Sequence, residues 1–128
     1  MKKSKILIVD DEKNVCSFLV EFLHFKGFDA DYALSGDEAI KKLSHDTFDL
    51  ILLDLIMPKI SGFDVLRYLQ ENRFDIPVIV LTGVRDEKAL ISTRELGAKD
   101  YITKPIDLEK LENSIILNIN RVNKKVVD

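Results

Sequence analysis

The stretch FDLILLD, residues 48–54, is apolar at every position from Leu50 to Leu53 and ends on an aspartate. A strand with one face in solvent alternates apolar and polar residues, whereas an unbroken apolar run is typical of a strand covered on both faces. Similar runs occur at residues 5–9 (KILIV) and 76–82 (IPVIVLT). The three runs therefore indicate the interior of a parallel sheet that carries helices on each side.

Helical periodicity fills the segments between these runs. Apolar side chains recur there at intervals of three and four residues, as they do on one face of a helix. Ser35 and Glu38 have the spacing of a capping box at one helix start. Two shorter stretches complete a set of five strands. The expected helices cover residues 15–23, 35–43, 62–72, 86–96 and 108–122, and the shorter strands cover residues 28–33 and 100–104.

Strands that alternate with helices predict a parallel sheet with helices on both faces. The common order for five such strands is 2-1-3-4-5, with ligands bound beyond the carboxyl ends of strands one and three. We therefore predict an α/β, doubly wound, five-stranded parallel sheet of this order, which is the flavodoxin-like arrangement. Residues 1–122 should form one domain, and residues 123–128 a C-terminal tail or the start of a linker.

The composition is that of an ordinary globular domain. Hydrophobic residues make up 46% and charged residues 32% of the 128 positions. The net charge of −3 gives no basic excess for nucleic acid, and the apolar run near the N-terminus is too short for a signal peptide or a membrane span. The single cysteine, Cys16, has no disulfide partner within these residues. We expect a cytoplasmic protein whose direct partners include neither nucleic acid nor membrane.

Polar residues follow the predicted strands at their carboxyl ends. Asp10 and Asp11 follow the first strand, Asp54 ends the third, Thr82 ends the fourth and Lys104 ends the fifth. In a parallel sheet all these ends lie along one edge, so the five side chains should gather there.

Carboxylates that crowd together repel one another and need compensation, which a hard divalent cation with oxygen ligands supplies. Mg²⁺ fits such an open site, with Mn²⁺ as the alternative ion, and it commonly shares its coordination with phosphate. Lys104 and Thr82 suit phosphoryl oxygens. An aspartate beside such a cation can act as a nucleophile and form an acyl phosphate.

Four motifs occur in order at the strand ends: VDDE at residues 9–12, LLDLIMPKISG at 52–62, VLTG at 80–83 and GAKDYITKP at 97–105. With these motifs the chain resembles the receiver domain of bacterial two-component response regulators, over residues 5–121. Each motif alone is modest evidence, whereas all four in this order are highly specific.

The resemblance implies that Asp54 is the phosphoryl acceptor. It also implies that Asp10 and Asp11 hold Mg²⁺, helped by Asp54 and by the backbone carbonyl of Ile56.

Further roles follow from the same resemblance. Thr82 and Lys104 should contact the phosphoryl oxygens, and Gly83 should leave room for the group. Tyr101 matches an aromatic switch position whose rotamer follows the Thr82 contact. The bond between Lys104 and Pro105 matches a cis peptide.

The expected function is a phosphorylation-activated signalling switch. A sensor histidine kinase or a histidine phosphotransfer protein would donate the phosphoryl group. The chain would catalyse its own phosphorylation and a slow self-dephosphorylation, and it would not be a turnover enzyme. Ile56 and Val84 are both apolar and flank the site in sequence, so we expect them to exclude the hydrolytic water and to prolong the phosphorylated state. The alternative is that Ile56 points outward and packs on a neighbouring loop, which leaves the water path open.

The output surface is expected on the fourth helix, the fifth strand and the fifth helix. The apolar stripe of residues 86–96 is weak, and a loosely held helix costs little free energy to move. This surface would bind a downstream effector domain or protein, and it would also support a phosphorylation-dependent homodimer.

Three other functions agree less well with the sequence. A phosphatase of the haloacid-dehalogenase type needs a second aspartate two residues after the nucleophile, where this chain has Ile56. A flavin carrier needs a phosphate-binding loop after the first strand, where the acids of DDEKN, residues 10–14, would repel phosphate. A degenerate receiver would only dock a partner independently of phosphorylation. The complete set of acidic, hydroxyl and lysine residues argues against this last alternative.

Overall fold

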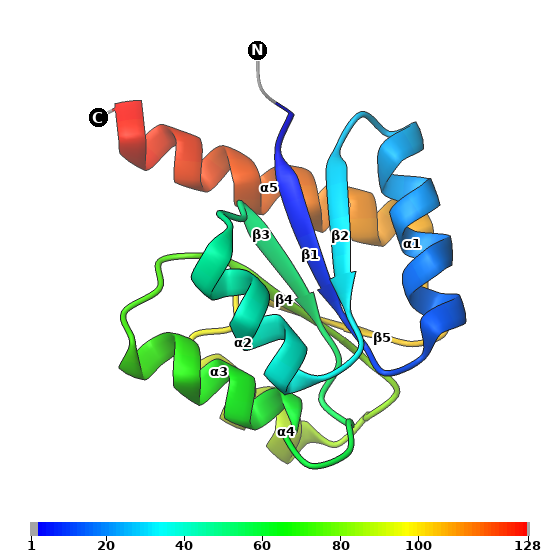
Figure 1. Ribbon diagram of the computed structural model, residues 1–128, viewed down its shortest axis with the longest axis vertical. Helices are drawn as coiled ribbons and strands as arrows, with labels where there is room; N and C mark the ends of the chain where they lie inside the picture. Colours follow the sequence, from blue (N-terminus) through cyan, green and yellow to red (C-terminus); the bar gives the residue numbers. More distant parts are fainter. Residues whose placement is uncertain (1–2, 128) are drawn as a thin grey trace.

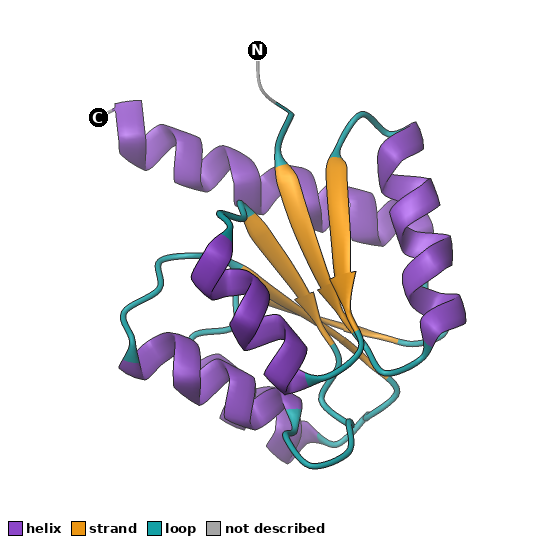
Figure 2. Cartoon of the chain, viewed as in Figure 1, coloured by secondary structure: helices purple, strands orange, loops and turns teal. Residues whose placement is uncertain are grey.

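The computed structural model describes the backbone of residues 3–127 and the side chains of residues 3–120. A five-stranded sheet forms its centre, with helices packed on both faces (Figures 1 and 2). The strands are β1 (Lys5–Val9), β2 (Asp29–Ala33), β3 (Leu50–Leu53), β4 (Val78–Thr82) and β5 (Asp100–Thr103). The helices are α1 (Lys13–Phe25), α2 (Gly36–His45), α3 (Gly62–Glu71), α4 (Glu87–Glu95) and α5 (Leu108–Val127).

The strand order is β2-β1-β3-β4-β5, and each neighbouring pair is parallel. The predicted fold is therefore confirmed. The central pair β1 and β3 ends in register, with Val9 opposite Leu53. The N–H of Asp54 donates to the carbonyl of Val9 at 2.9 Å. This register places the residues that follow the two strands side by side.

Two apolar layers explain the unbroken apolar runs of the sequence. Leu7 and Val9 of β1 pack in the layer beneath α2, α3 and α4, whereas Ile6 and Ile8 pack in the layer beneath α1 and α5. Figure 1 shows these helices on the two sides of the sheet. Because each strand residue is covered whichever way it points, the central strands have no solvent-facing positions for polar residues.

The helix starts differ in part from expectation. The Ser35 hydroxyl accepts the Glu38 N–H at 3.1 Å, but the Glu38 carboxylate accepts the N–H of Leu34 instead of that of Ser35. The predicted capping box is therefore only half formed, because the carboxylate reaches one residue further back. A complete capping box occurs at α3, where Ser61 and Asp64 bond each other's backbone N–H groups.

Helix α5 continues to Val127, through most of the segment predicted to be a tail or linker. Residue 128 and the side chains from residue 121 onward lie outside the described part of the chain. The domain boundary at residue 122 therefore stays a prediction. None of the helices in the described residues combines the length and hydropathy needed to cross a membrane.

Candidate functional site

The predicted polar residues lie at the carboxyl ends of neighbouring strands. Asp10 follows β1, Asp54 follows β3, Thr82 is the last residue of β4 and Lys104 follows β5. The N–H of Lys104 donates to the carbonyl of Thr82 at 2.8 Å, which continues the ladder beyond the end of β5. The expectation that these residues share one edge of the sheet is confirmed.

Three carboxylates meet at this edge. Asp10, Asp11 and Asp54 each offer an oxygen, and these oxygens all lie within 4.8 Å of one another. Asp10 and Asp54 are buried, whereas Asp11 is exposed. A set of three closely spaced carboxylate oxygens fits a hard divalent cation such as Mg²⁺. The backbone N–H of Ile56 donates to Asp54 at 3.5 Å, but the predicted metal contact of the Ile56 carbonyl stays a prediction.

Lys104 supplies the positive charge at the cluster. Its Nζ lies 2.8 Å from Asp10 Oδ2 and 3.5 Å from Asp54 Oδ2. Burial lowers the pKa of the Lys104 ammonium, but the hydrogen bond and charge of Asp10, together with the charges of Asp54 and Glu12, raise this pKa above its ordinary value. Lys104 is therefore charged at neutral pH and offsets part of the repulsion among the carboxylates.

The two predicted switch residues contact the same loop residue. Thr82 is fully buried, and its Oγ1 accepts the N–H of Val84 at 3.4 Å. The Tyr101 hydroxyl donates to the carbonyl of Val84 at 2.7 Å. Burial raises the pKa of the Tyr101 phenol, and the charges of Asp86 and Asp54 add to this effect. Val84 thus links Thr82 to Tyr101 in the structure.

Other residues of the predicted site have mixed outcomes. A Cβ at Gly83 would meet no atom within 4 Å, so there is open space at this position. The bond between Lys104 and Pro105 is cis, as the resemblance implies. Ile56, by contrast, is 64% exposed. This exposure favours the alternative in which Ile56 points outward, and the shielding of the site by Ile56 and Val84 stays a prediction.

The structure adds residues that the sequence did not single out for the site. The Cys16 thiol is buried and donates to the carbonyl of Asp10 at 3.3 Å. The Arg85 guanidinium donates to the carbonyl of Lys104 at 2.9 Å. Neither contact has a signal in the sequence, since each joins residues through a backbone carbonyl. Gly62 packs on the backbone of Asp54. Its position in the motif at residues 52–62 is the sequence signal that could have linked it to the site.

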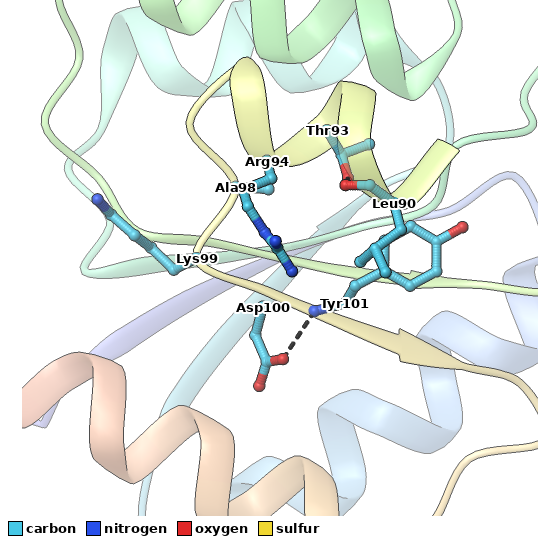
Figure 3. Close-up of a pocket in the computed structure, with 7 residues that line it drawn as sticks. All are labelled: Leu90, Thr93, Arg94, Ala98, Lys99, Asp100 and Tyr101. Atoms are coloured by element: carbon cyan, nitrogen blue, oxygen red, sulfur yellow. Dashed lines mark hydrogen bonds between the residues drawn. The ribbon is translucent and has the colours of Figure 1, made fainter. Parts of the chain in front are cut away.

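A cavity of about 110 Å³ lies between α4 and β5 on the predicted output surface. In Figure 3 the Tyr101 ring lies beside Leu90 of α4, whereas the Asp100 carboxylate points toward α5. That carboxylate accepts the Ser114 hydroxyl and the N–H of Tyr101. Helix α4 buries only Ala89 and Thr93, so few apolar contacts hold it on the sheet. The lining residues are Leu90, Thr93, Arg94, Ala98, Lys99, Asp100 and Tyr101.

The family model described as "Response regulator receiver domain" matches residues 6–116. The chain belongs to the response regulator receiver family of two-component systems, whose general function is that of a phosphorylation switch and whose members are generally not turnover enzymes. The resemblance stated from the motifs is therefore confirmed. Homologues of this family act with histidine kinases and downstream effectors.

Two curated relatives illustrate the similarity. The chain is 39% identical over 124 residues to "Probable transcriptional regulator ycf27" of Porphyridium aerugineum, covering 97% of this chain and 51% of that protein. It is 40% identical over 101 residues to the alkaline phosphatase synthesis transcriptional regulatory protein PhoP of Bacillus subtilis, covering 79% of this chain and 42% of that protein. The chain thus spans about half the length of the curated relatives it matches.

Solved structures share the fold over nearly the whole chain. A CheY-like receiver domain protein from Methanospirillum hungatei is 26% identical, with a TM-score of 0.92 and coverage of 97% of this chain and 99% of that one. TrrA from Thermotoga maritima, solved in complex with Mg²⁺ and BeF, is 32% identical, with a TM-score of 0.81 and coverage of 90% and 98%.

Proposed function

We propose that this chain is a phosphorylation-activated switch in which Asp54 accepts a phosphoryl group from a histidine kinase or a histidine phosphotransfer protein. The proposal rests on the cluster of the Asp10, Asp11 and Asp54 carboxylates, together with the Lys104 ammonium that forms ion pairs with two of them. Asp54 follows the central strand β3, and both the other two carboxylates and the Lys104 ammonium lie close to it. This arrangement supports phosphoryl transfer, which depends mainly on positioning and charge neutralisation.

The transfer is a displacement at phosphorus. A carboxylate oxygen of Asp54 attacks the phosphorus and forms an O–P bond, while the N–P bond to the donor histidine breaks. The electron pair of that bond stays on the ring nitrogen, and a proton on the other ring nitrogen lets the donor leave as neutral imidazole. The product on this chain is an acyl phosphate of Asp54.

The acidic residues would hold the metal that this chemistry needs. Asp10, Asp11 and Asp54 fit Mg²⁺ by their oxygen donors and spacing, and we assign the Ile56 carbonyl as a further ligand. When bound, the ion supplies positive charge against the carboxylates and the phosphoryl oxygens.

Lys104 and Thr82 would bind the transferred group. Lys104 now donates to Asp10 at 2.8 Å, and a phosphoryl oxygen would compete for the same ammonium. Thr82 accepts the Val84 N–H, so its own hydroxyl proton is available to a phosphoryl oxygen. The Tyr101 hydroxyl is hydrogen-bonded to Val84, so a movement of Thr82 toward the phosphoryl group would also affect Tyr101. Tyr101 would in this way transmit the movement to the surface formed by α4, β5 and α5.

The comparison with TrrA supports this chemistry, since that receiver was solved with Mg²⁺ and a fluoroberyllate, a phosphoryl mimic. We further propose that the surface of α4, β5 and α5 binds a downstream effector and supports a phosphorylation-dependent homodimer. The chain would turn over no substrate beyond its own phosphorylation and slow dephosphorylation. Residues 1–122 would form the receiver domain, and residues 123–128 a C-terminal tail or the start of a linker.

Intact mass spectrometry with acetyl phosphate as donor tests the proposal. The chain should gain one phosphoryl group with Mg²⁺ and none with excess EDTA. Asp54→Asn should abolish the gain, and Asp49→Asn, at an exposed aspartate before β3, should preserve it. If the unchanged chain gains no phosphoryl group, a phosphorylation-independent docking module replaces the proposed switch.

A further inference from the structure

Arg85 joins two neighbouring loops, which follow the carboxyl ends of the adjacent strands β4 and β5. It belongs to the segment between β4 and α4, whereas Lys104 belongs to the segment between β5 and α5. The Arg85 Nη2 donates to the Lys104 carbonyl at 2.9 Å. A guanidinium donor makes this hydrogen bond charge-assisted, and the planar group fixes its direction.

Both the N–H and the carbonyl of Lys104 form hydrogen bonds. Its N–H donates to the carbonyl of Thr82 at 2.8 Å, and its carbonyl accepts the Arg85 guanidinium. The first of these bonds extends the sheet, whereas the second depends on a single side chain. The Lys104 side chain that reaches Asp10 and Asp54 therefore starts from a backbone that Arg85 helps to fix.

The same loop is bonded to β5 by a second contact. The Tyr101 hydroxyl donates to the carbonyl of Val84, the residue that precedes Arg85. Val84 thus accepts a hydrogen bond from Tyr101, and the next residue, Arg85, donates one to Lys104. A displacement of this loop would change the placement of both residues together.

We infer that Arg85 is a positioning residue that sets the placement of the Lys104 ammonium for phosphoryl binding. This inference rests on the proposed function of Asp54 and Lys104. Arg85 acts through the Lys104 backbone and does not need to touch the phosphoryl group. A misplacement of a binding group by about 1 Å can cost up to about a hundredfold in rate, so the loss of one such contact should be measurable.

A double-mutant cycle separates an effect through Lys104 from a general loss of charge. The rate of phosphoryl uptake from acetyl phosphate with Mg²⁺ is measured for Arg85→Ala, Lys104→Ala and the double variant. Arg85→Ala should slow uptake by about three- to tenfold. In the Lys104→Ala background the same change should have no further effect, because two residues that act as a unit are not additive.

Two further variants control for charge and for the donor. Arg67→Ala removes an exposed arginine of α3 whose ion pair is with Asp64, and it should leave the rate unchanged. Arg85→Lys retains a cationic donor and should recover part of the rate. Uptake by Arg85→Ala at the wild-type rate, or an equal slowing with and without Lys104, would overturn the inference while leaving the proposed function intact.

If the unchanged chain takes up no phosphoryl group, the positioning role of Arg85 is tested on the unphosphorylated protein instead. The amide resonance of Lys104 should shift, and its hydrogen exchange should accelerate, in Arg85→Ala but not in Arg67→Ala. A Lys104 amide that is unchanged by Arg85→Ala would refute the positioning role, whatever the outcome at Asp54.

Discussion

Gly62, the first residue of α3, packs directly on the backbone of Asp54. A Cβ atom at position 62 would lie 2.3 Å from the Asp54 carbonyl oxygen and 2.7 Å from the Cα of Leu55. The N–H of Gly62 also donates to the carbonyl of Leu55 at 2.9 Å. The start of α3 therefore supports the backbone that carries the proposed phosphoryl acceptor, and only glycine fits there.

Gly62→Ala should destabilise the protein and disturb Asp54. Backbone atoms cannot move aside as a flexible side chain does, so the free energy of unfolding should fall by about 1–3 kcal/mol. Urea unfolding measures this change. Gly83→Ala is the matched control, since a Cβ there meets no atom within 4 Å. Equal stability of the two variants would contradict the close packing of Gly62 on Asp54.

Mg²⁺ should stabilise the folded protein through the carboxylate cluster. A ligand that binds only the folded state adds about 2.7 kcal/mol at a hundred times its Kd. Asp11→Asn should lose most of this gain, because Asp11 is one of the three clustered carboxylates. Thermal unfolding with and without Mg²⁺, at matched ionic strength, measures the effect. Glu12→Gln, the neighbouring exposed acid outside the cluster, should keep the gain.

Lys104→Met should destabilise the metal-free protein. The change leaves the buried carboxylates of Asp10 and Asp54 without their ammonium partner. Losing one member of a largely buried ion pair costs up to about 3–5 kcal/mol, and the partial exposure of Lys104 places the expected loss at about 2 kcal/mol. Mg²⁺ should restore part of that loss in urea unfolding. A variant as stable as the parent without Mg²⁺ would show that Lys104 does not compensate the cluster.

Much of this arrangement was predictable from the sequence. Asp10 and Asp54 follow apolar runs of central strands, and parallel strands end at one edge, so their proximity follows from the fold. The hydrogen bond of Arg85 and the exposure of the Ile56 side chain could not be predicted in this way. Their placement depends on loop conformations that periodicity does not describe, and the partner of Arg85 is a backbone carbonyl, which every residue possesses.

The helix starts also show that spacing in the sequence does not fix the direction of a side chain. Ser35 and Glu38 have the spacing of a capping box, yet the Glu38 carboxylate bonds Leu34. At α3 the box is complete with an aspartate, Asp64, in place of the usual glutamate or glutamine. Spacing predicted that a helix begins at Ser35, but the direction of the long Glu38 side chain depends on the local backbone.

The Cys16 thiol should be unreactive in the native protein. Burial, with the charge of Asp10 as the next cause, raises the pKa of this thiol to about 12. At pH 8 the thiolate fraction is then on the order of 10⁻⁴, and the thiolate is the reactive form. Ellman's reagent should therefore react only as the chain unfolds in urea. Rapid reaction under native conditions would contradict the buried contact with the Asp10 carbonyl.

Val84→Glu should shorten the lifetime of the phosphorylated state more than Ile56→Asn does. Val84 is half-buried beside Thr82, whereas Ile56 is 64% exposed and excludes little water. A carboxylate at position 84 can orient the attacking water, which valine cannot. Decay of the acyl phosphate, followed by intact mass after removal of the donor, gives the half-lives. A larger effect at position 56 would show that the exposed Ile56 still shields the site.

The most direct measurement is the identity of the phosphorylated residue. After incubation with acetyl phosphate and Mg²⁺, borohydride reduction converts an aspartyl phosphate to homoserine, which peptide sequencing can locate. Trypsin releases residues 43–59, which contain Asp46, Asp49 and Asp54 and so provide an internal comparison. We predict homoserine at position 54 alone. Homoserine at any other aspartate, or a phosphoryl group that remains after Asp54→Asn, would contradict the assignment of Asp54 as the acceptor.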